Sequence, residues 1–153
     1  MNALALSLRR TLLLLFLVVP LAACQLFSPA FDPNVGNPTT QAYEAAMQLV
    51  SEAEYGRFQD PATFADASQR YAAIDAQLAA ARIRVEAGDG GSTSLSRRAQ
   101  GLLAGQIQGC RTELQSLART HARIGVAPNA GLTEQVVAAC DMAARSANGM
   151  ANE

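Results

Sequence analysis

Apolar residues recur at alternating spacings of three and four along most of the chain after residue 38. This period places apolar side chains on one face of an α-helix. It is clearest in two runs, one between residues 61 and 87 and one between residues 94 and 124. The first is Phe64, Ala67, Tyr71, Ile74, Leu78, Ala81 and Val85, and the second is Leu103, Ile107, Cys110, Leu114, Leu117, His121 and Ile124. We therefore predict two helices, each with one buried face.

Proline marks the start of two of the predicted helices. Asn37-Pro38 and Asp60-Pro61 each combine an N-cap residue with a proline suited to the first helical turn. They predict one helix from residue 38 to about residue 58 and another from residue 61 to residue 87. The side chains expected to be buried on the first of these are Tyr43, Ala46, Met47, Val50 and Ala53.

Two more helices are expected in the second half of the chain. The third begins at Thr93 or Ser94, after a flexible glycine-rich linker that starts at Gly88, and ends at Gly125. Thr133 is placed to cap a fourth helix that runs to about residue 147. Its inward side chains are expected to be Val136, Cys140, Ala143 and Ala147.

These helices predict an all-α protein, an antiparallel up-down-up-down four-helix bundle over residues 38–148, with a disordered tail at residues 149–153. The composition agrees with this fold class. Half of the residues (50%) are apolar, but only 5% are aromatic and Trp is absent, because alanine and leucine supply most of the apolar side chains.

Charge and residue types exclude several classes of function. The formal net charge is −1, so the chain lacks the basic excess that binding a nucleic acid requires. All 12 basic residues are arginine, which excludes Schiff-base chemistry and a phosphate-loop lysine. The single histidine excludes a metal site built on a histidine pair. No motif supports a nucleophile with its base, so we expect no catalytic residues, no metal and no cofactor.

The first 24 residues have the layout of an export signal. Arg9 and Arg10 precede a short apolar stretch at residues 11–19, which is too short to span a membrane. The segment Leu21-Ala22-Ala23-Cys24 then resembles the lipobox of bacterial lipoproteins, which signal peptidase II cleaves before the cysteine. The resemblance implies that residues 1–23 are removed and that Cys24 is lipidated, with palmitate among the acyl chains.

The same resemblance implies a protein held at a membrane that it does not cross. Three acyl chains exceed what stable anchoring requires. Gln25 stands where, in enteric-type sorting, aspartate favours the inner membrane, so we expect the periplasmic face of the outer membrane. Residues 24–37, with two prolines and no apolar period, are expected to form a flexible tether.

Cys110 and Cys140 are the two thiols that remain once Cys24 is lipidated. An even pair in an oxidising compartment predicts one disulfide, here between the third and fourth helices, although two unlinked buried thiols are the alternative. The helical rise places Cys110 about 21 Å from Ile124, but Cys140 only about 10 Å from Thr133. The bridge therefore requires the intervening loop to run back along the third helix.

His121 lies on the apolar face of the third helix, close to its end. In a bundle similar to the b-type haem proteins, Met47 and His121 would be the axial pair, which makes a haem or small-ligand carrier the alternative function. In that family the histidine stands in the last helix. We therefore interpret His121 as a structural residue, either capped or half-exposed.

Gly101, Gly105 and Gly109 repeat at every fourth position of the third helix. Each costs a helix interior about 1 kcal/mol relative to alanine, but allows another helix to approach closely. Three explanations are open. The glycines contact the first or second helix, they break the third helix, or they form a groove for a partner helix or for the same helix of a second copy.

In architecture and location the chain looks like the pilotins, small helical lipoproteins that carry secretin subunits to the outer membrane. That resemblance implies a non-catalytic protein-interaction or envelope-assembly module, whose partner is an envelope protein or a second copy. It rests on fold and location alone, since none of the pilotins' motifs is found in the chain.

Overall fold

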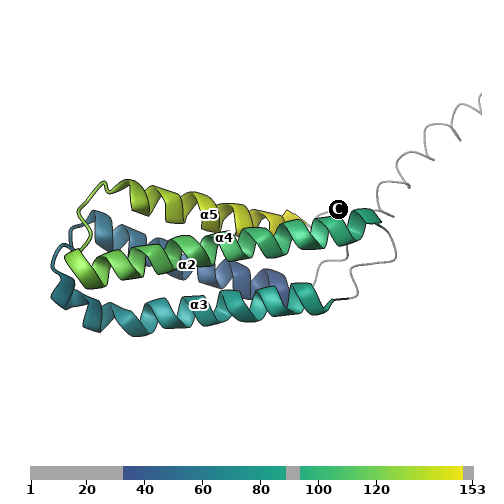
Figure 1. Ribbon diagram of the computed structural model, residues 1–153, viewed down its shortest axis with the longest axis horizontal. Coiled ribbons are helices and arrows are strands. Elements are labelled where there is room, and N and C mark those ends of the chain that lie inside the picture. Colours follow the sequence, from purple (N-terminus) through teal and green to yellow (C-terminus); the bar gives the residue numbers. More distant parts are fainter. Residues whose placement is uncertain (1–32, 89–93, 150–153) are drawn as a thin grey trace, which may run out of the picture.

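Four antiparallel helices form the computed structural model of the chain, which describes residues 33–88 and 94–149 (Figure 1). The helices are α2 (Pro33–Glu54), α3 (Phe64–Ala87), α4 (Ser94–Ile124) and α5 (Gly131–Gly149), and a 3₁₀ turn, η1 (Pro61–Thr63), precedes α3. Each helix packs against its neighbours in sequence, and α5 closes the bundle against α2. The predicted all-α up-down bundle is confirmed.

Most of the predicted apolar residues form the core, but Tyr43 and Met47 on α2 and Phe64 on α3 are only partly buried against it. On α3, the residues from Ala67 to Val85 in the predicted run are at most 6% exposed, and the four inward residues of α5 are buried as well. On α4 the one exception is Ile124, which is 67% exposed. The prediction is wrong there because α4 ends at this residue. After the turn at Gly125, Val126 takes the buried place instead and is 1% exposed.

The first helix begins earlier than the sequence indicates. α2 starts at Pro33, so Asn37-Pro38 lies inside it and residues 33–37 of the predicted tether are helical. Pro38 has no N–H to donate to the carbonyl oxygen of Asn34. The guanidinium of Arg84, on α3, donates to that oxygen at 2.8 Å. A contact between helices thus replaces the hydrogen bond that proline removes.

The connection between α2 and α3 turns sharply. α2 ends at Glu54 and not near Phe58, because Gly56 has a left-handed φ of +77°. The start signal at Asp60 is confirmed, since its carboxylate accepts a hydrogen bond from the N–H of Ala62 at 2.8 Å. This cap opens the 3₁₀ turn that leads into α3.

A second connection, residues 125–130, packs against the first at the end of the bundle that we call the loop end. Gly125 has a φ of +78°, and a Cβ added to it would lie 1.9 Å from the carbonyl oxygen of Gln59. The next residue, Val126, donates its N–H to the carbonyl oxygen of Phe58 at 2.6 Å. Only glycine allows the two backbones to come this close.

The start of α5 depends on a residue of α2. The helix begins at Gly131, so Thr133 lies inside its first turn and is not the predicted N-cap. Glu54 instead accepts hydrogen bonds from the buried Thr133 hydroxyl and from the N–H of Asn129, the latter at 2.7 Å. These two bonds, that of Thr133 first, lower the pKa of Glu54.

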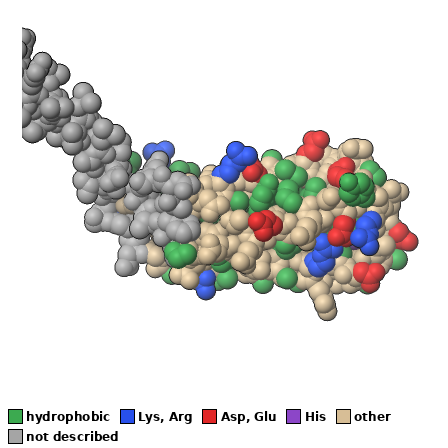
Figure 2. Space-filling model, turned by 180° about the vertical axis from the view of Figure 1, so that it is seen from behind, with side chains coloured by type: hydrophobic (Ala, Val, Ile, Leu, Met, Phe, Trp, Pro, Cys, Tyr) green, Lys and Arg blue, Asp and Glu red, His purple; other side chains and the backbone are tan. Residues whose placement is uncertain are grey.

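On the face turned away from α4, ion pairs join α2 to its surroundings. Glu52 pairs with Arg70 on α3 at 2.8 Å and lies 3.7 Å from Arg57. Figure 2 views this face and shows acidic side chains gathered toward the loop end. Because these pairs are partly exposed, each adds little to stability.

Candidate functional site

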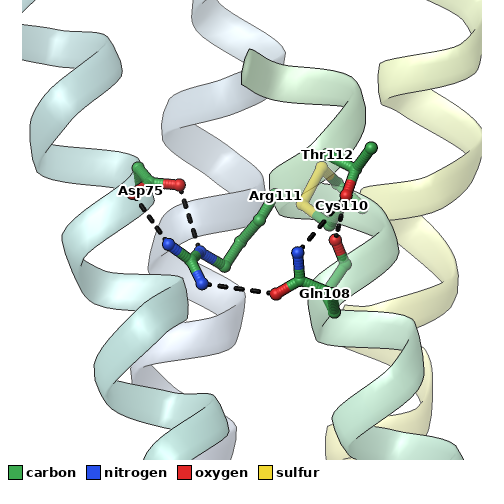
Figure 3. The surroundings of a disulfide bond; sticks show 6 residues. Asp75, Gln108, Cys110, Arg111 and Thr112 are labelled. Atoms are coloured by element: carbon green, nitrogen blue, oxygen red, sulfur yellow. Dashed lines mark hydrogen bonds and ion pairs between the residues drawn. A yellow bond between two sulfur atoms is a disulfide. The ribbon is translucent and has the colours of Figure 1, made fainter. Parts of the chain in front are cut away.

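Cys110 on α4 and Cys140 on α5 form the predicted disulfide, with an S–S distance of 2.04 Å and a Cα–Cα distance of 4.5 Å (Figure 3). Both residues are 1% exposed. Figure 1 shows how the register is achieved, because α5 begins short of the end of α4. The loop of residues 125–130 therefore runs back along α4, as the helical rise requires.

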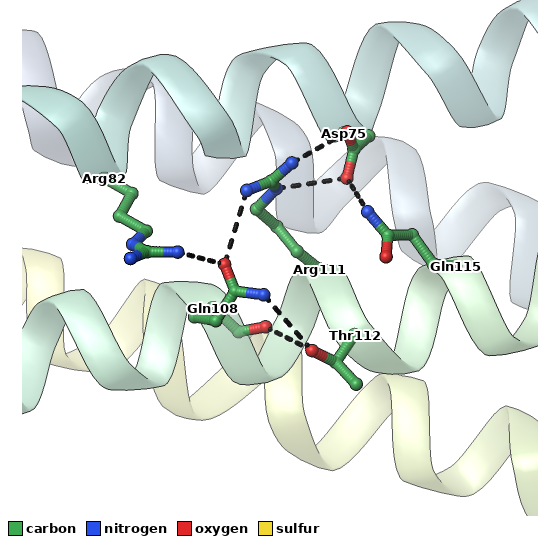
Figure 4. Close-up of polar contacts among 6 residues, drawn as sticks. All are labelled: Asp75, Arg82, Gln108, Arg111, Thr112 and Gln115. Atoms are coloured by element: carbon green, nitrogen blue, oxygen red, sulfur yellow. Dashed lines mark hydrogen bonds and ion pairs between the residues drawn. The ribbon is translucent and has the colours of Figure 1, made fainter.

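The residue next to Cys110 ties α4 to its other neighbour. The guanidinium of Arg111 donates to both carboxylate oxygens of Asp75 on α3, at 3.1 and 3.0 Å (Figure 4). Gln115 donates to the same carboxylate at 2.8 Å. Adjacent residues of α4 thus fix this helix to α5 through a covalent bond and to α3 through a bidentate ion pair.

This polar cluster is structural in character. Arg111, and with it Gln115, lowers the pKa of Asp75, so the carboxylate stays ionised near neutral pH and is a weaker proton acceptor than a free carboxylate. The side-chain oxygen of Gln108 accepts from Arg82 at 2.5 Å and from Arg111 at 3.3 Å. The charged groups of Asp75 and Arg111 thus pair with each other, and Gln108 accepts from both arginines.

His121 is 0% exposed at the loop end, so the expectation of a half-exposed ring is wrong. The ring stacks on Phe58 with centroids 4.3 Å apart and meets Phe64 edge-on at 5.5 Å. Tyr71 completes an aromatic cluster around it, with centroids 6.0 Å apart. One aromatic ring from the connection after α2 and two from α3 thus surround the histidine.

The hydrogen bonds of His121 define its tautomer. The Thr63 hydroxyl donates to the carbonyl oxygen of Asp60 at 2.6 Å, so its oxygen accepts from Nε2–H of His121 at 2.8 Å. Nδ1 is then the acceptor for the Tyr71 hydroxyl, at 3.4 Å. Burial lowers the pKa of His121, which keeps the ring neutral at pH 7.

The haem alternative gains no support from this arrangement. Both ring nitrogens of His121 are engaged within the protein, so iron coordination requires the loss of the hydrogen bond to Thr63 or of the one to Tyr71. Met47, the other proposed axial ligand, is partly buried against the core on α2. Among the described residues, no group of three or more His, Cys, Asp or Glu is placed to hold a metal ion.

The three glycines of α4 face outward. Gly101 and Gly105 are exposed, Gly109 is partly exposed, and a Cβ added to any of them meets no atom within 4 Å. An internal contact with another helix is therefore wrong as an explanation. A break is wrong as well, because α4 continues from Ser94 to Ile124. The third explanation, a docking groove, stays a prediction.

The lipobox and Cys24 lie outside the described residues, as do most of the glycine linker and of the predicted tail. None of the described helices is both long and apolar enough to cross a membrane. Comparison of the chain with protein-family models, with curated proteins and with solved structures finds no match.

Proposed function

We propose that this chain is a lipoprotein of the bacterial cell envelope, anchored through Cys24 at the periplasmic face of the outer membrane. The observation that carries the proposal is the buried Cys110–Cys140 disulfide. Structural disulfides persist in oxidising compartments and are rare in the reducing cytosol. Cys110 and Cys140 are two of the three cysteines in the chain. The third, Cys24, ends the lipobox and is followed by Gln25.

The bundle itself we propose to be a non-catalytic protein-interaction or envelope-assembly module, similar in architecture to the pilotins. Two observations support this role. Asp75 is paired with Arg111 and His121 with Thr63 and Tyr71, so neither side chain is left free for proton transfer. The outer face of α4 offers a row of small residues on which a partner helix, from an envelope protein or a second copy, can pack closely.

Lipidation is testable through an unusual feature of the composition. Because the chain has no lysine, the α-amino group of Cys24 is the only amine in the mature protein. If Cys24 is fully acylated, amine-reactive reagents label nothing in the purified wild type. The matched control is Cys24→Ser, which leaves an unlipidated precursor with a free N-terminus that does label.

Two results would contradict the anchor. One is stoichiometric amine labelling of the mature wild type, and the other is wild type found free in the periplasmic fraction. Affinity purification from detergent-solubilised membranes then addresses the interaction role. A stable envelope partner or a second copy is expected in the eluate, whereas a monomer that retains no protein contradicts that role.

A further inference from the structure

The first turns of α4 extend beyond the end of α3. Gln100, six positions into α4, donates from its amide to the carbonyl oxygens of Val85 and Gly88, the latter at 2.7 Å. These are the last carbonyls of α3 and its cap. The residues of α4 that precede Gln100 therefore lie past the end of α3.

The same turns also extend beyond α5. The disulfide places Cys110 and Cys140 at the same level of two antiparallel helices. Gly149, at the end of α5, lies nine positions after Cys140 and is therefore level with Gly101. Figure 1 shows the projecting turns at the end of the bundle where α2 begins. Residues 94–99 thus project past both neighbouring helices, and we call them, together with the residues up to Leu102 that follow directly (Ser94–Leu102), the overhang.

The overhang carries exposed leucines and exposed arginines, of which Leu95, Arg98 and Leu102 share one side of the helix and Arg97 lies on the other. Leu95 and Leu102 are 58% and 61% exposed, and they are two of the six large apolar side chains that the described residues expose. Arg97 and Arg98 are also exposed, and neither makes a hydrogen bond or ion pair with another described residue. This combination is typical of surfaces that lie at the boundary between lipid headgroups and acyl chains.

The position of the start of α2 indicates what the overhang faces. α2 begins at Pro33, at the same end of the bundle as the overhang. Cys24 lies nine positions earlier, and nine residues span at most about 30 Å. If Cys24 is lipidated, as we propose above, the start of α2 stays within that distance of the bilayer surface, and the overhang lies at the same end of the bundle.

We propose that the overhang docks on an anionic bilayer surface, with Leu95 and Leu102 at the level of the headgroups and Arg97 and Arg98 on lipid phosphates. A bundle held in this way stands on the membrane. Gly105 and Gly109 lie further along α4, past the overhang, and stay accessible to a partner.

Tryptophan is the probe for the test, because the natural chain contains none. Lipidated Leu102→Trp is reconstituted into vesicles of phosphatidylglycerol and phosphatidylcholine, with and without brominated acyl chains. The matched control is Tyr55→Trp at the loop end, where the natural side chain is 85% exposed. We expect the emission of Leu102→Trp to shift to shorter wavelength and to be quenched at least twofold by the brominated lipid, and that of Tyr55→Trp to do neither.

Charge is tested in the same background. Arg97→Gln combined with Arg98→Gln should weaken the docked orientation by about fivefold for each arginine, seen as a loss of quenching, while the protein still floats with the vesicles. Vesicles of phosphatidylcholine alone should produce a similar loss. Quenching that persists unchanged in both cases contradicts the role of the arginines.

Several results would overturn the proposal. If Leu102→Trp floats with the vesicles but emits like Tyr55→Trp, the overhang does not touch the bilayer although the anchor holds. A blue shift without quenching, together with a cross-linked dimer or hetero-complex, means that a protein covers this face instead. A wild type that does not float contradicts the lipid anchor itself and with it the position assigned to the overhang.

Discussion

At the loop end, a Cβ added to Gly125 would lie 1.9 Å from a backbone oxygen, whereas on the outer face of α4 a Cβ added to Gly105 would meet nothing within 4 Å. The first glycine is required by the packing of the chain against itself. The second lowers helix stability by about 1 kcal/mol with no compensation inside the bundle. The second fits the docking groove that we propose for the outer face of α4.

The polar residues of the two regions differ in the same way. At the loop end, Glu54 and His121 each have two hydrogen-bond partners within the chain. On the outer side of α4, Arg97 and Arg98 have none among the described residues. The loop end is thus determined by internal contacts, and the outer face of α4 is available for external ones.

The largest expected effect on stability comes from the Cys110–Cys140 disulfide. It links α4 to α5 on the side of α4 that lies opposite the glycine row. It closes a loop of 30 residues, for which chain entropy indicates a contribution of about 3 to 4 kcal/mol. Reduction should therefore lower the melting temperature markedly, and a Cys110→Ala, Cys140→Ala variant should not respond to reductant. Free alkylation of both thiols in the native protein would refute the link.

Substituting Gly125 with alanine should destabilise the protein by about 3 kcal/mol. The new methyl group meets the backbone at Gln59 while φ stays in the left-handed region, so two backbone segments have to move apart. Urea unfolding of the variant measures the loss. An unchanged midpoint would mean that the loop end is not as closely packed as described.

Stability should also depend on the protonation of His121. Its pKa in the folded chain lies below its ordinary 6.5, so the unfolded chain binds a proton first as the pH falls. The free energy of unfolding should therefore be fully retained above pH 6.5 and decrease as the pH drops below it. Asp75 and Glu54 have lowered pKa values and act only at more acidic pH.

The control for this effect is His121→Phe. In that variant the hydroxyls of Thr63 and Tyr71 lose their hydrogen bonds to the ring nitrogens, so it should be less stable than wild type at every pH. Its melting temperature should nevertheless lose the slope between pH 7.5 and pH 5. The same slope in both proteins would assign the pH dependence to another group.

The smallest effect is expected for Gly105→Ala. The same substitution that destabilises the loop end at Gly125 should here stabilise the protein by up to about 1 kcal/mol, since the added methyl enters open space in a helix. Thermal melting of both alanine variants beside wild type gives the comparison directly. A loss of stability at Gly105 would indicate an internal contact.

Local patterns in the sequence predicted the helices, the apolar faces and the disulfide, because helical period and cysteine count are properties of the chain alone. They could not predict that Arg84 replaces the hydrogen bond lost at Pro38, so the start of α2 was misplaced. They also could not predict that Val126 is buried in place of Ile124, because the turn at Gly125 is set by its contact with another loop. The pair of Asp75 and Arg111 is 36 positions apart and carries no sequence signal.

Gly105→Leu is the most direct test of the docking groove on α4. The predicted result is a bundle that melts at or above the temperature of wild type, because the side chain projects from an open helix face. The same variant should fail to co-purify with the partner, or with the second copy, that wild type retains, since a leucine blocks close helix packing. If the variant melts well below wild type, and wild type retains no protein, the glycine row is not a docking groove.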